Sequence, residues 1–223
     1  MQLTAPRDQL SRISSRLKQL GGLASLELAW EVLAYSYVGV SAAVESAFSQ
    51  ASSDAMRKLR AREFSRLNPT QLAAVAESSF IAFYDAERAR RRYDPSRAMA
   101  MRELLVSEIR GSEARSPRKS VLESTGIPGR EHFRLFFQVA TGGMDPRGAN
   151  NGAPLARLVG RINEIGGPRN VFAHECAEPS QYEFLAGQGT DWGALASAVS
   201  ALENVIGDLQ ELFDALEAAC ATL

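Results

Sequence analysis

The chain is poor in the residues from which disulfide frameworks and most metal sites are built. Its 223 residues include two cysteines, Cys176 and Cys220, and two histidines, His132 and His174. Two cysteines without ligand spacing exclude a zinc-finger pattern and a disulfide scaffold, and they are typical of a reducing compartment. We therefore predict a protein that uses no metal and no other cofactor.

A signal peptide and a clean membrane span are also missing. Residues 1–8 lack the apolar core of a signal peptide. The most apolar run, from Leu23 to Val44, is long enough to cross a bilayer, but Glu27 and Glu31 interrupt it. Because carboxylates in hydrocarbon are costly, a helix of a soluble protein is the better interpretation. We expect a cytoplasmic globular protein without a membrane segment.

The chain has no overall basic excess, since its net charge is −1. The charge is nevertheless unevenly spread. From Asp54 to Lys119 there are 15 basic and nine acidic residues, whereas the segment from Ala173 onward has nine acidic residues and no Lys or Arg. This asymmetry indicates that one face meets phosphates or an acidic partner while another repels them.

No alternating strand pattern is present, and apolar residues instead recur at steps of three and four. The pattern predicts an all-α protein, a bundle of six to eight helices in a single domain over residues 1–223. In the first half of the chain, we expect the first helix to end at Gly21-Gly22, a third to be capped by Ser52 to Asp54, a fourth to be capped by Thr70, and a fifth to lie near 96–109. In the second half, we expect a short aromatic helix from Arg130 to Ala140 and a helix that begins at Pro154 and ends at Gly166-Gly167. The last helix should begin at Thr190 or Asp191.

Individual residues within these helices carry further expectations. Trp30 and Trp192 fall on apolar stripes, so we expect both in the core. Gly39 interrupts a helical pattern at a cost of roughly 1 kcal/mol relative to Ala, which predicts that another helix approaches closely there. His132 lies beside Phe133 and has no matching arginine before it, which favours a structural role.

One short motif carries recognisable chemistry. Arg169 is followed at once by Asn170 and, five residues on, by His174. Arginine is common in this chain, but asparagine occurs only six times, so the full pattern should arise by chance on the order of once in a hundred cases. A histidine can transfer protons near neutral pH, and a guanidinium offers planar paired donors to phosphate oxygens. The motif therefore predicts phosphodiester chemistry, with Asn170 orienting one of the other two side chains.

The motif resembles the catalytic signature of the HEPN-domain ribonuclease family. Ile127-Pro128, the aromatic helix after Gly129 and the segment Leu155 to Val159 extend the similarity over roughly residues 120–223, with the helices of 1–110 as an additional N-terminal region packed on it. The resemblance implies a metal-independent endoribonuclease of a toxin or antiviral-defence system. It further implies a homodimer with the active site at its interface, and an antitoxin or defence-system partner protein. The residues implied are Arg169, Asn170 and His174 for catalysis, and Arg157, Arg161 and Glu175 for RNA binding.

Four other interpretations stay open. The fold could be a HEPN-like module that binds RNA or protein without cutting. His174 and Glu178 are spaced as two metal ligands on one helical face, although no third ligand is evident. The chain could be an unrelated helical protein whose long C-terminal helix binds a partner. Finally, His174 could be a structural histidine near a capped helix start.

Overall fold

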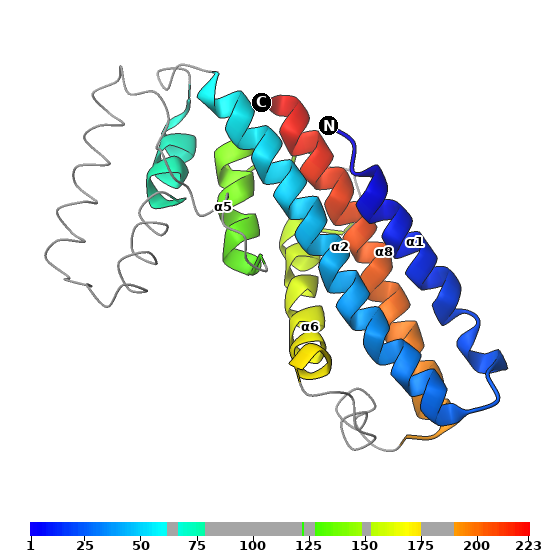
Figure 1. The fold of residues 1–223 in the computed structure, drawn as a ribbon. Helices are drawn as coiled ribbons and strands as arrows, with labels where there is room; N and C mark the ends of the chain where they lie inside the picture. Colours follow the sequence, from blue (N-terminus) through cyan, green and yellow to red (C-terminus); the bar gives the residue numbers. More distant parts are fainter. Residues whose placement is uncertain (62–66, 79–121, 123–127, 149–152, 175–189) are drawn as a thin grey trace, which may run out of the picture. The chain divides into compact units, whose positions relative to one another are not determined.

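The computed structural model describes residues 1–61, 67–78, 122, 128–148, 153–174 and 190–223. Every regular element in these ranges is helical, so the predicted all-α class is confirmed (Figure 1). The elements are α1 (Thr4–Leu17), the 3-10 turn η1 (Leu20–Gly22), α2 (Leu26–Arg60), a helical segment over 69–78, α5 (Arg130–Thr141), α6 (Leu155–His174) and α8 (Trp192–Thr222). The helix predicted near 96–109 lies outside the described residues.

Two compact units share the long helices α2 and α8. The α1 unit comprises Gln2–Ala47 and Asn151–Asp214, and the α5 unit comprises Met1, Phe48–Asn150 and Ala215–Leu223. The candidate motif lies in the α1 unit, which is built from α1, the first part of α2, α6 and most of α8.

Helices α1 and α2 pack closely at Gly39. Gln9 Nε2 donates a hydrogen bond of 2.9 Å to the carbonyl oxygen of Gly39. A Cβ atom at position 39 would lie 3.0 Å from Cδ1 of Ile13, so the missing side chain makes room for Ile13. Leu10, Ile13 and Leu17 of α1 are all buried. The predicted close approach at Gly39 is confirmed.

Helix α8 begins where the sequence predicts. Asp191 Oδ1 accepts a hydrogen bond of 2.8 Å from the amide of Ala194, which caps the first turn. The predicted apolar stripe is buried from Leu195 to Leu223, except for the half-buried Val199. Trp192, however, is 42% exposed, so its predicted place in the core is wrong. Periodicity assigns Trp192 to the apolar face of α8, but it does not tell how far neighbouring helices extend along that face.

The predicted break at Ser52 to Asp54 does not occur, and α2 runs through it to Arg60. Ser52 is 1% exposed, and its hydroxyl donates to the carbonyl oxygen of Ser49 within the same helix. Ala51, Ala55 and Met56 are buried around it. Residues that favour helix caps are tolerated within a helix when their hydroxyl bonds to the preceding turn and tertiary burial favours continuation.

The α5 unit is organised around aromatic side chains. The ring of Phe48 lies 4.7 Å from that of Phe133 and 6.0 Å from that of Phe136, measured between centroids.

The helix over 69–78 is capped by Asn68. Its Oδ1 accepts a hydrogen bond of 2.9 Å from the amide of Gln71, and Gln71 Oε1 accepts one of 3.1 Å from the amide of Asn68. The predicted cap at Thr70 is therefore wrong, because this reciprocal pair already satisfies the free amides of the first turn.

Candidate functional site

The motif lies in the last turns of α6, which do not form the break that the sequence predicts. The helix continues through Gly166, Gly167 and Pro168 to His174. A proline inside a helix cannot donate to the carbonyl four residues earlier, which costs about 3 kcal/mol. The continuation, however, extends the buried face at Ile165 to Pro168 and Phe172 at helical spacing. Burial of this face offsets the cost, so the predicted helix end at Gly166-Gly167 is wrong.

The motif residues share one continuous helix. Asn170 is exposed and Arg169 is partly exposed. Arg169 Nη1 donates a hydrogen bond of 3.1 Å to Oδ1 of Asn170. Position 174 follows position 170 by four residues on α6, so the two positions share a face of the helix. Asn170 thus contacts the guanidinium of Arg169, as its predicted orienting role requires.

Phe172 holds this end of α6 in the α1 unit. Its side chain is 5% exposed and lies against Tyr37 of α2, with 6.5 Å between ring centroids and a tilt of 45°. Burial raises the pKa of Tyr37, and the negative charge of Glu164 raises it further. Tyr37 is therefore a neutral packing residue at physiological pH. The buried ring of Phe172 and the exposed Asn170 lie on different faces of the same helix.

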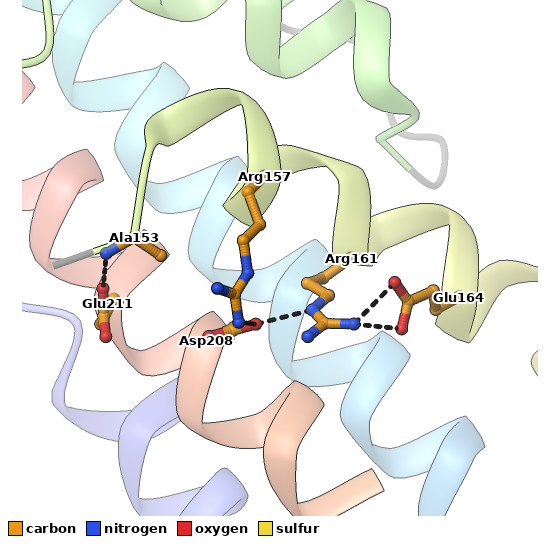
Figure 2. A network of polar contacts seen from close by, with 6 residues as sticks. All are labelled: Ala153, Arg157, Arg161, Glu164, Asp208 and Glu211. Atoms are coloured by element: carbon orange, nitrogen blue, oxygen red, sulfur yellow. Dashed lines mark hydrogen bonds and ion pairs between the residues drawn. The ribbon is translucent and has the colours of Figure 1, made fainter. Parts of the chain in front are cut away.

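Arg157 and Arg161 are engaged by carboxylates within the α1 unit (Figure 2). Asp208 Oδ2 accepts from Arg161 Nε at 2.6 Å and from Arg157 Nη2 at 3.3 Å. Glu164 receives two further hydrogen bonds from Arg161 Nη1, at 2.8 and 2.7 Å. Glu164 and then Asp208 raise the pKa of Arg161. The predicted RNA-binding arginines thus form an ion-pair network that joins α6 to α8.

The two arginines differ in how far solvent reaches them. The side chain of Arg157 is 58% exposed, whereas that of Arg161 is 22% exposed and that of Asp208 is 12% exposed. Arg157 reaches Asp208 with a single long contact and keeps donors that face solvent. Arg161 is hydrogen-bonded to both Asp208 and Glu164. A phosphate would therefore meet Arg157 more readily than Arg161.

The same network fixes the start of α6. The amide of Ala153 donates a hydrogen bond of 3.0 Å to Glu211 Oε2 (Figure 2). Glu211 and Asp208 belong to α8 and lie three residues apart on it. Sequence reasoning missed both carboxylates, because their partners are about fifty residues away in the chain and no local pattern links them.

Several predicted site residues lie outside the part of the chain that the structure describes. Glu175, Cys176 and Glu178 lie beyond the described residues, so the predicted RNA contact of Glu175 stays a prediction. Within the described part of the chain, no three His, Cys, Asp or Glu side chains lie close enough to hold a metal ion. His132 has the structural contacts that its sequence context favours: its Nδ1 accepts from the amide of Gly129 at 3.2 Å, and its ring meets Phe48 edge-on.

Comparisons with family models, with curated proteins and with solved structures find no match to this chain. Among the helices that the structure describes, none combines the length and apolarity needed to cross a membrane. The geometry of the α1 unit is thus the evidence on which a functional proposal depends.

Proposed function

We propose that this chain is a metal-independent, HEPN-like endoribonuclease of a toxin or antiviral-defence system, acting in the cytoplasm. The observation that carries the proposal is the placement of Arg169 and Asn170 at solvent-accessible positions of α6, hydrogen-bonded to each other and followed by His174 on the same helix. The helix thus carries a guanidinium that is hydrogen-bonded to Asn170, and position 174 shares the face of Asn170 one turn further along.

The proposed reaction is a transesterification within the RNA backbone. His174 removes the proton of a 2′-hydroxyl, and the 2′-oxygen attacks the adjacent phosphorus. Arg169 stabilises the negative charge that develops on the phosphoryl oxygens, since its planar donors match them. The bond to the 5′-oxygen then breaks and that oxygen takes up a proton. The products are a 2′,3′-cyclic phosphate and a 5′-hydroxyl.

One histidine cannot easily be base and acid at the same time. We therefore include a second protomer in the proposal, paired about a two-fold axis so that two copies of the motif face one cleft. Such a dimer would supply a second His174 to protonate the leaving oxygen. Position 174 lies four residues after the exposed Asn170 on α6 and so shares its face of the helix, which is compatible with such pairing.

The test is cleavage of a labelled single-stranded RNA in EDTA. His174→Ala and Arg169→Ala should each lower the cleavage rate by about a hundredfold or more, with the helical circular-dichroism signal and the melting temperature unchanged. Arg130→Ala is the matched control, because Arg130 is an exposed arginine of α5 in the other unit. Product ends should be cyclic phosphates. Parental rates in either motif variant, or activity that disappears in EDTA, would contradict the proposal.

A second candidate is a HEPN-like module that binds RNA or protein without cutting. The ion pairs of Arg157 and Arg161 with Asp208 favour it, because they give both arginines a role in holding α6 to α8. Under this alternative the parent binds RNA, or a partner protein such as an antitoxin, but releases no cleavage product. The cleavage assay separates the two candidates directly.

A further inference from the structure

A groove between α1 and α2 has a chemistry that the proposed reaction does not use. It has a volume of about 540 Å³ and is lined by Gln9, Arg12, Ile13, Arg16, Val32, Tyr35, Ser36 and Gly39. Its floor is the close contact between Ile13 and Gly39 described above, and the Gln9–Gly39 hydrogen bond joins its two walls. The groove is therefore a consequence of the packing of two helices in the α1 unit.

Two arginines on one wall have no carboxylate partner among the residues that the structure describes. Arg12 and Arg16 are exposed and lie four residues apart on α1, so both project from the same face of the helix. Within the part of the chain that the structure describes, neither forms an ion pair, in contrast to Arg7 on the same helix, which binds Asp214 at 2.6 Å. Among the described residues that line the groove, none is acidic.

The opposite wall presents an aromatic ring to solvent. Tyr35 of α2 is 60% exposed, the highest exposure of any tyrosine that the structure describes. An aromatic face beside a basic groove is the arrangement with which proteins bind single-stranded nucleic acid, because the base stacks on the ring while cations bind the backbone. The volume is in the range that holds a small-molecule group of nucleotide size.

We propose that this groove binds a nucleotide of single-stranded RNA. The base stacks on Tyr35, and Arg12 and Arg16 bind the flanking phosphates. They lie about 6 Å apart along the helix axis, which lets them contact neighbouring phosphate groups. Identifying the ligand as RNA rests on the proposed function. The anion-binding chemistry of the groove depends only on Arg12, Arg16 and Tyr35.

The experiment measures binding of a fluorescent oligouridylate of about ten nucleotides by anisotropy, in the His174→Ala background so that the RNA stays intact. Tyr35→Ala should weaken binding about tenfold, which corresponds to the loss of one stacked base. The double variant Arg12→Gln, Arg16→Gln should weaken binding and reduce the slope of log affinity against log salt by about 1.4, the value for two phosphate contacts with a single strand.

The matched control is the double variant Lys18→Gln, Arg130→Gln. It removes the same charge from exposed positions that do not line the groove. We expect it to leave both the affinity and the salt slope near those of the parent. Circular dichroism of the groove and control variants should match that of the His174→Ala background, because the side chains at positions 12, 16, 18, 35 and 130 are exposed.

The outcomes separate this inference from the proposed function. If the groove variants bind RNA with the affinity and salt slope of the control, the groove is not an RNA site, whatever the parent cleaves. If they lose binding but the parent releases no cleavage product, the groove is an RNA site and the ribonuclease proposal fails. Equal loss of affinity in the groove variants and the control would show a non-specific charge effect and would overturn the inference.

Discussion

Asp208 is a single carboxylate that binds two guanidiniums, so its charge has a measurable structural role. Asp208→Asn keeps the shape of the side chain but weakens both contacts to α6. We expect a loss of about 1 to 2 kcal/mol in the free energy of unfolding, because a mostly buried hydrogen bond between charged groups contributes more to stability than an exposed ion pair does. Urea unfolding at pH 7 measures the change.

The matched control for this prediction is Asp214→Asn. Asp214 also binds an arginine of another helix, Arg7, at 2.6 Å, but its side chain is 61% exposed. An exposed pair contributes at most about 1 kcal/mol. Equal destabilisation by both variants would contradict a special role for Asp208. If Arg157 and Arg161 also bind RNA, Asp208→Asn should raise RNA affinity while it lowers stability.

Cys220 provides a pH-dependent prediction. Its side chain is fully buried, with Sγ 3.4 Å from the carbonyl oxygen of Ala51, and burial raises the pKa of the thiol from 9.0 to about 11. The folded state therefore holds its proton more tightly than the unfolded state. The resulting stability is fully present below pH 9 and is lost as the pH rises toward 11, by about 2 kcal/mol.

The measurement compares urea unfolding of the parent and of Cys220→Ala between pH 8 and pH 11. Tyrosines and lysines titrate in both proteins, so the difference between the two curves isolates the thiol. We expect the parent to lose more stability than the variant across this range. Parallel curves would show that Cys220 ionises as easily in the folded state as in the unfolded state.

At the scale of the element, alanine substitutions at two helical glycines test whether the close contact of α1 with α2 depends on the missing side chain of Gly39. Among the described residues, no atom lies within 4 Å of the place of a Cβ at Gly207 of α8, so Gly207→Ala should stabilise the protein by about 0.5 to 1 kcal/mol through helix propensity. Gly39→Ala has the same propensity gain, but its methyl group would lie 3.0 Å from Ile13. We expect Gly39→Ala to be less stable than Gly207→Ala.

Thermal and urea unfolding of both alanine variants give this comparison. Gly39→Leu extends it, because a larger side chain must displace α1 and should cost about 1 to 3 kcal/mol. Equal stabilisation by Gly39→Ala and Gly207→Ala would mean that Ile13 moves aside freely. In that case the contact between α1 and α2 at Gly39 would not depend on the missing side chain.

At the scale of the whole molecule, the proposed reaction requires two protomers. Light scattering at micromolar concentration should give a mass near twice the 24.2 kDa of one chain. Mixing His174→Ala protomers with Arg169→Ala protomers should give more cleavage than either variant alone but far less than the parent, because a mixed dimer has one His174 and one Arg169 in the shared cleft and lacks the second His174 that protonates the leaving oxygen. A strictly monomeric protein that still cleaves RNA would exclude the shared site.

Local sequence determined the helical class and much of the periodic packing. The apolar residues of α1 are buried as predicted, and so are those of α8 apart from the exposed Trp192 and the half-buried Val199. Helix α5 lies within one residue of its predicted range, and Gly39 marks a close helix contact. These features follow from the spacing of apolar residues at three and four, which is a property of neighbouring positions. The hydrogen bond between Arg169 and Asn170 also depends on local sequence, since adjacent residues on a helix can bond to each other without the rest of the fold.

Only the tertiary structure decided that α2 and α6 continue past local break signals and what their polar side chains bind. Ser52 is a signal for the start of a new helix and Gly166-Gly167 for the end of one, but burial of Ala55 and Phe172 beyond them favours continuation of each helix. The pairing of Arg161 with Asp208 joins residues far apart in the chain. A lost cap costs about 1 kcal/mol and a proline inside a helix about 3 kcal/mol, whereas each large apolar side chain that is buried contributes about 2 kcal/mol or more. Beyond these signals Met56, Leu59 and Phe172 are all buried. Contacts distant in sequence therefore override the local preference.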